Sequence, residues 1–230
     1  MIVASYNIRK AIGSDRRRRP DRILDVLREV DADIIALQEA DRRFGARQSA
    51  LPLHMIAEHS DYMPVPFDIR PGSLGWHGNA LLVRKAATIL HHAPLTLPAL
   101  EPRGAVLADI RLGGREIRVV GMHLDLSGLW RRRQAHAVMA HIQQQPRALP
   151  TVMMGDMNEW RRHGGCLSDF GQHYRFAETG PSFHARQPIA RLDRIVVGEG
   201  LTVAETGVHR SLHARTASDH LPIWARLRFG

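Results

Sequence analysis

Residues 151–158 read TVMMGDMN, an apolar run that ends in a glycine and two polar side chains. The apolar part is typical of a buried strand. Gly155 permits a sharp exit from that strand, so Asp156 and Asn158, two positions apart, can face one cavity. A carboxylate there can hold an attacking water, and an amide can donate to a phosphate oxygen. An Asx turn would use the same residues, and this stretch alone does not separate the two interpretations.

The same arrangement, a polar cluster at the end of an apolar run, recurs along the chain. Side chains at strand ends can converge on one rim of a sheet, and carboxylates, amides and imidazoles suit a hard metal ion and a phosphate. The other clusters are Ser5-Tyr6-Asn7, Gln38-Glu39, Gly78-Asn79, His123, Asp193 and Ser218-Asp219-His220.

Strand-like runs outnumber helix-like runs in this sequence. Strands are predicted over residues 2–7, 33–37, 80–83, 105–110, 116–122, 151–154, 192–197 and 221–229, and helices over 51–59, 130–144 and a segment opened by Pro20. The Gly113-Gly114 turn predicts a hairpin between residues 105–110 and 116–122. We therefore expect an α/β fold of two packed sheets with helices outside, rather than one parallel sheet.

Length and composition indicate an ordinary globular protein. The chain has 230 residues, 44% of them hydrophobic and 24% charged. We expect one domain spanning residues 1–230, in monomeric form. No apolar run approaches the roughly 20 residues that span a bilayer. The single Cys166 excludes an internal disulfide, and with the absence of a signal-peptide pattern it favours a cytoplasmic location.

The net charge of +9 favours polyanionic partners such as nucleic acid or an anionic lipid head group, including peripheral membrane contact. Only Lys10 and Lys85 are lysines, so 30 of the 32 basic residues are arginine, a skew that codon bias can also produce. Residues 16–19 are four consecutive arginines, which fit either a polyanion contact or a solvated loop.

Three oxygen-bearing side chains form a candidate metal site. Asn7, Glu39 and Asp219 each end or adjoin an apolar run, and one amide oxygen with two carboxylates suits Mg²⁺ or Mn²⁺. For Asn7 or Glu39 taken alone, a turn residue at a strand end is the better explanation. Their joint placement is what favours the metal site.

Two histidines are candidates for phosphate chemistry. His220 could stabilise a pentacoordinate transition state if a carboxylate fixes its tautomer, and Asp193 within a buried strand is a candidate partner. A salt bridge from Asp193 to Arg191 or Arg194 is the alternative. His123, at the end of the run over residues 116–122, could contact a phosphate or protonate a leaving group.

The ordered set of clusters resembles the endonuclease/exonuclease/phosphatase superfamily, which includes deoxyribonuclease I, abasic endonucleases, sphingomyelinases and inositol polyphosphate 5-phosphatases. The resemblance runs from Asn7 to His220 and is strongest at residues 38–39, 155–158 and 218–222. It implies a four-layered α/β/β/α sandwich of two mainly antiparallel sheets flanked by helices, and divalent-metal hydrolysis of phosphodiesters or phosphomonoesters.

The resemblance also implies residue roles. It places Asn7, Glu39 and Asp219 around the metal, Asp156 with the nucleophilic water, Asn158 on the phosphate and His220 paired with Asp193. His123 matches a histidine of the deoxyribonuclease I and sphingomyelinase branches, and Glu101 is a candidate partner for it. Further candidates for substrate contact are Asn79, Arg103 in the family-like stretch over residues 101–104, and Trp160.

The sequence thus predicts a metal-dependent phosphodiesterase that uses in-line attack by an activated water. Net charge favours nucleic acid as substrate, whereas the compact length favours a phospholipid or small phosphodiester. The alternative is a catalytically silent, basic module that binds nucleic acid or membranes. No expected ligand is missing from the sequence, which favours the enzyme.

Overall fold

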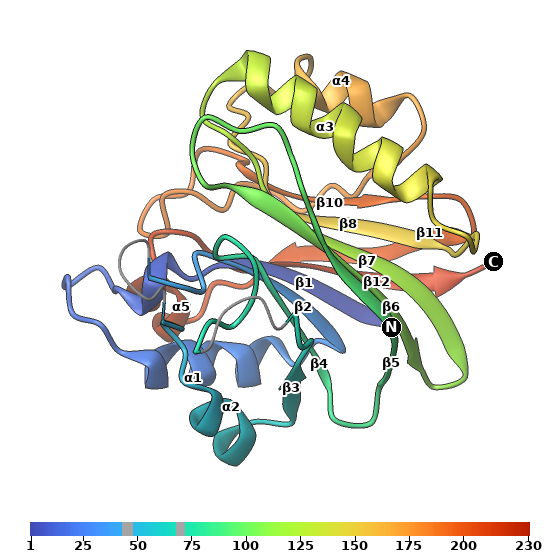
Figure 1. Ribbon diagram of the computed structural model, residues 1–230. Helices are drawn as coiled ribbons and strands as arrows, with labels where there is room; N and C mark the ends of the chain where they lie inside the picture. The colour runs from blue at the N-terminus through green and yellow to red at the C-terminus, as the bar shows by residue number, and fades with distance from the viewer. Residues whose placement is uncertain (43–47, 68–71) are drawn as a thin grey trace.

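Two six-stranded sheets pack face to face in the computed structural model, which describes residues 1–42, 48–67 and 72–230 (Figure 1). The first sheet has the order β11-β12-β1-β2-β4-β3. Its strands are β1 (Ile2–Asn7), β2 (Ile34–Gln38), β3 (Tyr62–Pro64), β4 (Ala80–Arg84), β11 (Leu201–Val208) and β12 (Ile223–Phe229).

The second sheet has the order β5-β6-β7-β8-β10-β9. Its strands are β5 (Thr88–Leu95), β6 (Gly104–Leu112), β7 (Arg115–His123), β8 (Thr151–Asp156), β9 (Arg175–Phe176) and β10 (Asp193–Val197). Each sheet contains one parallel pair, β1 with β2 and β7 with β8, and the other neighbours are antiparallel. The predicted hairpin is β6–β7.

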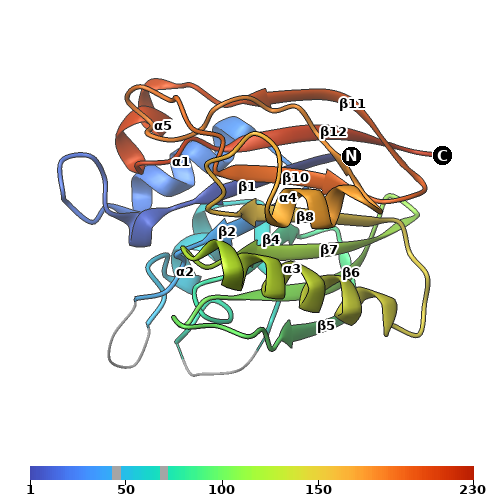
Figure 2. The ribbon, with the colours of Figure 1, turned by 90° about the horizontal axis from the view of Figure 1, so that it is seen from above.

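Helices cover the outer face of each sheet. On the first sheet lie α1 (Pro20–Val30), α2 (Leu53–His59) and α5 (Leu212–Ala217), and on the second lie α3 (Gly128–Gln143) and α4 (Cys166–Gly171), as Figures 1 and 2 show. A 3₁₀ turn, η1 (Arg9–Ala11), follows β1. The predicted α/β/β/α sandwich is confirmed.

The alternation of side chains along each strand explains the layers. Val3 belongs to the core between the sheets, together with Val119 of the second sheet, whereas its neighbour Ala4 packs toward α1. On the second sheet, Val120 likewise faces α3. Both faces of each sheet are therefore apolar, and every fully buried Val, Leu or Ile contributes about 1.5–3 kcal/mol of transfer free energy.

Several elements lie outside the predictions made from sequence. The eight-residue strands β5 and β11 are half-exposed at the edges of their sheets, so they lack the apolar signature of the inner strands. Helices α4 and α5 have only six residues each, too few for a helical period to show. The inner strands and the long helices were predicted to within a few residues.

Candidate active site

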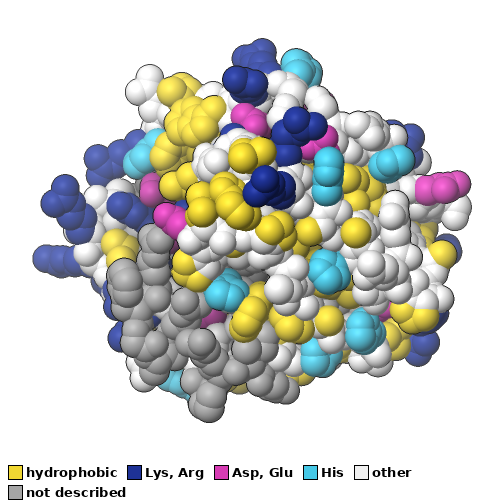
Figure 3. Space-filling model, turned by 45° about the horizontal axis from the view of Figure 1, so that its top comes forward, with side chains coloured by type: hydrophobic (Ala, Val, Ile, Leu, Met, Phe, Trp, Pro, Cys, Tyr) yellow, Lys and Arg dark blue, Asp and Glu magenta, His cyan; other side chains and the backbone are white. Residues whose placement is uncertain are grey.

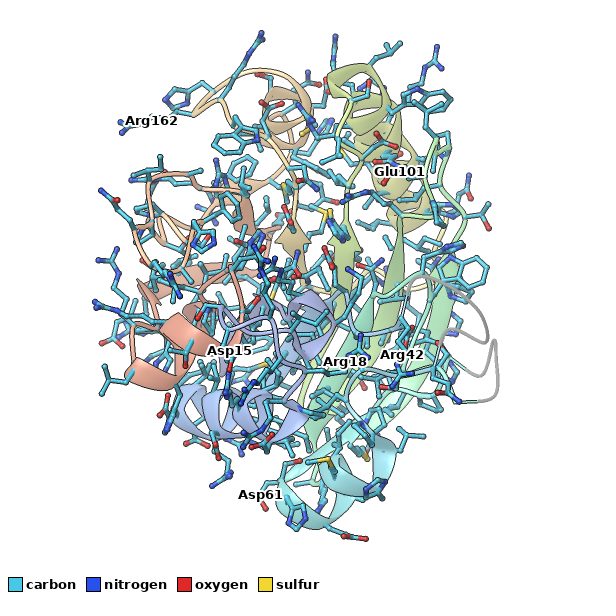
Figure 4. The ribbon with its side chains drawn as sticks, turned by 90° about the vertical axis from the view of Figure 1, so that its left-hand side faces the viewer. Asp15, Arg18, Arg42, Asp61, Glu101 and Arg162 are labelled. Carbon is cyan, nitrogen blue, oxygen red and sulfur yellow. The ribbon has the colours of Figure 1, made fainter. Side chains whose placement is uncertain are left out.

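The polar ends of five strands meet at one edge of the sandwich, which faces the viewer in Figure 4. In the first sheet Asn7 pairs with Gln38, the residue before Glu39. In the second sheet Asp156 pairs with His123 on one side and with Asp193 on the other. The two parallel strand pairs bring carboxyl ends to the same edge, so residues far apart in sequence become neighbours.

Asp156 lies at the centre of this edge and is almost fully buried. Its Oδ2 atom accepts a hydrogen bond from Nδ2 of Asn7 at 3.0 Å, which links the two sheets. Nε2 of His123 lies 3.4 Å from the same oxygen, and Nε2 of His220 lies 3.7 Å from it. Its other oxygen, Oδ1, accepts from the backbone N–H of Asn158 at 2.9 Å. One carboxylate thus faces two imidazoles and an amide.

The sharp exit predicted at Gly155 is present. Gly155 has φ +157°, and a Cβ atom there would lie 1.8 Å from the carbonyl oxygen of Met122, so only glycine fits. Asn158 adopts a left-handed backbone with φ 50°. Its side-chain Nδ2 donates to the carbonyl of Leu124 at 2.9 Å. The Asx-turn contact is therefore a feature of this segment, and a cavity shared by Asp156 and Asn158 stays a prediction.

His220 is held by Asp193 in a buried pair. Nδ1 of His220 lies 2.8 Å from Oδ2 of Asp193, and Ser182 donates its hydroxyl hydrogen to the same oxygen. Burial alone would lower the pKa of His220, but the charge and hydrogen bond of Asp193, with Asp156 and Asp219, raise that pKa to about 10. The ring is a cation at neutral pH, with Nε2–H directed toward Asp156.

Asp193 does not form the alternative salt bridge in the described part of the chain. Arg191 pairs with Glu178 at 2.7 Å, and Arg194 donates to the backbone carbonyl of Asp193 rather than to its carboxylate.

His123, unlike His220, is neutral at neutral pH. Burial, with the positive charges of Arg103 and His220, lowers its pKa to about 3 despite the nearby Asp156. Nη1 of Arg103 donates to Nε2 of His123, because a guanidinium can only donate. Nε of Arg103 also donates to Oε2 of Glu101 at 3.3 Å. Arg103 therefore lies between Glu101 and His123, whereas direct pairing of those two residues was expected from the sequence. In this state Nε2 of His123 is an acceptor and is not poised to protonate a leaving group.

The three predicted oxygen ligands lie beside two cations. Lys10 forms an ion pair with Oε2 of Glu39, and Nε of Arg9 lies 3.3 Å from Oδ2 of Asp219. The amide oxygen of Asn7 accepts the backbone N–H of Arg9 at 3.1 Å. Arg9 and Lys10 reach these positions from η1, where residues 9, 10 and 11 all have positive φ. Strain at non-glycine residues is typical of functional sites.

Glu39 is itself left-handed, with φ 53°, and it is fixed by a turn. Trp76 and Asn79 close a two-residue turn whose central residues, His77 and Gly78, both have positive φ, the pattern of a type I′ turn. The carbonyl of Gly78 accepts the N–H of Ala40, and a Cβ on Gly78 would lie 3.4 Å from Cα of Glu39.

The ligand types of Asn7, Glu39 and Asp219 match those of a hard divalent cation. Two carboxylates and an amide oxygen are the ligand types that Mg²⁺ and Mn²⁺ take, and both carboxylates are currently balanced by cationic side chains. A second set, Asp156, Asp193 and His220, has ligand atoms within 4.8 Å of one another. That set fits a metal less well, because a protonated imidazole bonded to Asp193 offers no lone pair.

The predicted substrate contacts have different surroundings. Asn79 is fully buried, and its Nδ2 donates to the carbonyls of Gly104 and Trp76. That is a turn role, and a substrate role for this amide stays a prediction. Trp160 is 63% exposed, and its ring packs edge-on against the ring of Phe183. The Phe183 ring in turn packs against the His220 ring, with 4.8 Å between the two ring centroids. Arg103 lines a cleft with Lys10, Glu39 and His123.

Sequence reasoning missed Arg9, Lys10 and Ser182, whereas the aromatic Phe183, in a loop adjoining the motifs, was a candidate for the substrate wall. Arg9 and Lys10 follow Asn7 closely, so their place beside the motif was an available signal. Ser182 carries no local signal, because it reaches the site through the isolated pairings of its neighbour Phe183 with Ala190 and His220. In the arginine run, Arg18 donates to the carbonyl of Lys10 at 3.1 Å, which ties that loop to η1. Arg19 pairs with Asp21.

The fold and the site define a class of two-sheet α/β proteins with a histidine–carboxylate centre at one sheet edge. The model of the Endonuclease/Exonuclease/phosphatase family matches residues 4–220, and the chain belongs to this family, which confirms the resemblance seen in the sequence. Members of the family are phosphoesterases, among them nucleases and phosphatases, and divalent metals are their general cofactor.

Individual proteins are similar to this chain over nearly its whole length. Over 249 aligned residues the chain is 29% identical to the uncharacterized protein YbhP of Escherichia coli strain K12, covering 98% of this chain and 95% of YbhP. A solved mannosyl-6-phosphatase from Bacteroides thetaiotaomicron matches with TM-score 0.77 and 22% identity over 100% of both chains. D. rerio TDP2, complexed with a single-strand DNA product, matches with TM-score 0.76 and 16% identity over 99% of this chain and 98% of TDP2.

Among the residues that the structure describes, no helix is long and apolar enough to cross a membrane.

Proposed function

We propose that this protein is a metal-dependent phosphoesterase that hydrolyses phosphodiester bonds. The observation that carries the proposal is the convergence on Oδ2 of Asp156, where the amide of Asn7 and the imidazolium of His220 both approach. A buried carboxylate opposite a fixed imidazolium provides a proton acceptor and a proton donor on two sides of one small space.

Each residue has a role that follows from its contacts. Asp156 orients the attacking water and accepts its proton, since Asn7 and the Asn158 N–H hold both of its oxygens. His220, held by Asp193, donates Nε2–H toward a phosphoryl oxygen as negative charge grows there. Arg103 brings a second cation to the cleft. Phosphate binding by Asn158 remains a prediction, because its amide donates to Leu124 in this structure.

Asn7, Glu39 and Asp219 would hold Mg²⁺ or Mn²⁺. When bound, the ion would supply positive charge to the phosphoryl group and help orient it.

A polyanionic substrate is supported by the surroundings of the site. Cationic side chains stand around the left-hand margin of the molecule in Figure 3, the same side as the loop that follows β1. Single-stranded nucleic acid fits this charge, and Trp160 offers an exposed ring on which a base could stack. A phospholipid or small phosphodiester is the other substrate class that we consider.

The proposal is tested with bis-p-nitrophenyl phosphate and Mg²⁺ or Mn²⁺, alongside Asp156→Ala and His220→Ala. We expect metal-dependent turnover that falls about 10³-fold or more in either variant. Arg228→Ala, which alters an exposed residue of β12, is the control and should keep wild-type activity. Wild-type turnover no higher than that of the two site variants would end the proposal. Parallel assays on plasmid, abasic duplex and anionic phospholipid then separate the substrate classes.

A further inference from the structure

A second cationic pocket lies on the α4 side of the second sheet. It is a cavity of about 410 Å³ between α4 and the segment that joins β9 to β10. Three arginines line it, and they are Arg162, Arg191 and Arg194. Its residues are distinct from those of the cleft between Glu39 and His123.

Arg194 is the unusual member of this pocket. It follows Asp193 in β10, so its side chain leaves the opposite face of the strand from the carboxylate that holds His220. The residue is only 7% exposed. Among the described residues, its side chain makes one hydrogen bond, from Nη1 to the carbonyl oxygen of Asp193 at 3.3 Å.

That environment is costly for a cation. A guanidinium carries five N–H donors, and a buried charge without a counter-ion is strongly disfavoured. Burial lowers the pKa of Arg194, although Asp193 opposes the shift. Arg194 is among the residues that line the cavity, so an anion there could accept charge-assisted hydrogen bonds from its guanidinium.

The other lining residues leave an excess of positive charge. Arg191 pairs with Glu178 at 2.7 Å, and the side chain of Glu178 is 80% exposed. Three arginines against one carboxylate give a lining charge of +2. Arg162 extends into solvent at the rim (Figure 4), and Ser168 and Thr179 add hydroxyl groups to the wall. Arginine with hydroxyl donors is a typical phosphate-binding set.

We propose that this pocket binds a phosphate group, with Arg194 as its central contact, and that it does so separately from the reacting centre. The chemistry shared by its possible ligands is a phosphate monoester or free phosphate. The site needs no bound metal, and it does not depend on the hydrolysis proposed above.

The test is a titration of the ¹⁵N-labelled protein with inorganic phosphate in the presence of EDTA, followed by NMR and calorimetry. We expect saturable shifts of the amides of Ser168, Thr179 and Arg194. Arg194→Met should weaken phosphate binding at least about tenfold, because charge-assisted hydrogen bonds are lost. Arg194→Lys should recover part of the affinity. Arg228→Met carries the same charge change at an exposed position and should bind as the wild type does.

A second pair of variants guards against misfolding of Arg194→Met. Arg191→Gln and Thr179→Val should each weaken binding, while Asp156→Asn in the reacting centre should not. Wild-type affinity in the Arg194, Arg191 and Thr179 variants would overturn the proposal, as would shifts confined to Asn158 and His220. Because no metal is present, an inactive enzyme would leave this result intact.

A further titration identifies the source of the phosphate. A 5′-phosphorylated tetranucleotide that binds more tightly than both its unphosphorylated form and inorganic phosphate assigns the pocket to nucleic-acid ends. Equal affinity for inorganic phosphate and the phosphorylated tetranucleotide assigns it to free phosphate or small esters.

Discussion

Nδ1 of His220 lies 2.8 Å from Oδ2 of Asp193, a residue 27 positions earlier in the chain. Both residues are buried, and Ser182 donates to the same carboxylate oxygen. The other oxygen, Oδ1, has no hydrogen-bond partner among the described residues. The charge and the hydrogen bond of Asp193 raise the pKa of His220, and the pairing at Nδ1 leaves Nε2 on the side of Asp156.

Replacing Asp193 by Asn should therefore lower kcat by about 10²–10³-fold, because a neutral amide no longer stabilises the imidazolium. Metal affinity should stay unchanged, since the expected ligands are elsewhere. Steady-state kinetics and metal titration measure the two effects. Ser182→Ala, which keeps the carboxylate, should cost less than Asp193→Asn. Equal activity of Asp193→Asn and the wild type would contradict the assigned role.

Glu39 and Asp156 should separate metal binding from proton transfer. Glu39→Gln removes a ligand charge and should weaken Mn²⁺ binding at least about tenfold, as followed by calorimetry. Asp156→Asn should leave Mn²⁺ affinity within a few-fold of wild type, while kcat falls about 10³-fold. If Asp156→Asn instead abolished Mn²⁺ binding while Glu39→Gln left it intact, the metal would belong to the set of Asp156, Asp193 and His220.

Arg118 and Asp109 form a buried bidentate pair across β6 and β7, with distances of 2.8 and 2.9 Å. Arg118→Met should lower the free energy of unfolding by about 3–5 kcal/mol, because it leaves the Asp109 charge buried without a partner. The double variant Arg118→Met/Asp109→Leu should recover most of that loss. Urea denaturation measures both, and a single variant as stable as the wild type would show that the pair is not essential.

The side chain of Glu29, near the end of α1, forms ion pairs with a residue of α5 and with one shortly before it. Helix α5 leads into residues 218–220. The oxygens of Glu29 lie 2.8 Å from His209 Nε2 and 2.6 Å from His213 Nδ1. Burial raises the pKa of Glu29, but hydrogen bonds from His209, Ser211 and His213 outweigh it and bring the pKa to about 2. A carboxyl group with a depressed pKa stabilises the fold above its unfolded pKa, and this contribution is lost as the pH falls from about 4.5 toward 2.

Glu29→Gln should therefore reduce the free energy of unfolding by about 1 kcal/mol at pH 6, a value kept small because the side chain is partly solvated. The difference from wild type should shrink between pH 4.5 and pH 2. Denaturation curves across this range measure it. Glu205→Gln, which breaks the exposed pair with Arg226, should show little change at any pH. A Glu29→Gln effect that grew on acidification would contradict the sign of the shift.

The inner strands were predictable because burial on both faces leaves a continuous apolar run, as at Val152-Met153-Met154. Edge strands β5 and β11 carry no such run and were missed. The catalytic candidates were also predictable as residue types, since Asp156, Asp219 and His220 end apolar runs. The partners Lys10 and Arg103 were not predictable as contacts, because they depend on the path of η1 and of the loop before β6.

The order of apolar strand segments and of the polar residues that end them determined the layered fold, the family and the oxygen-rich character of the site. That order is a property of the sequence alone. Only the tertiary structure decided which imidazole is charged. His220 lies against two carboxylates and is a cation, whereas His123 lies beside Arg103 and is neutral. The same side chain differs by a full charge because its pKa depends on burial and on neighbours from distant strands, and strand register sets those neighbours.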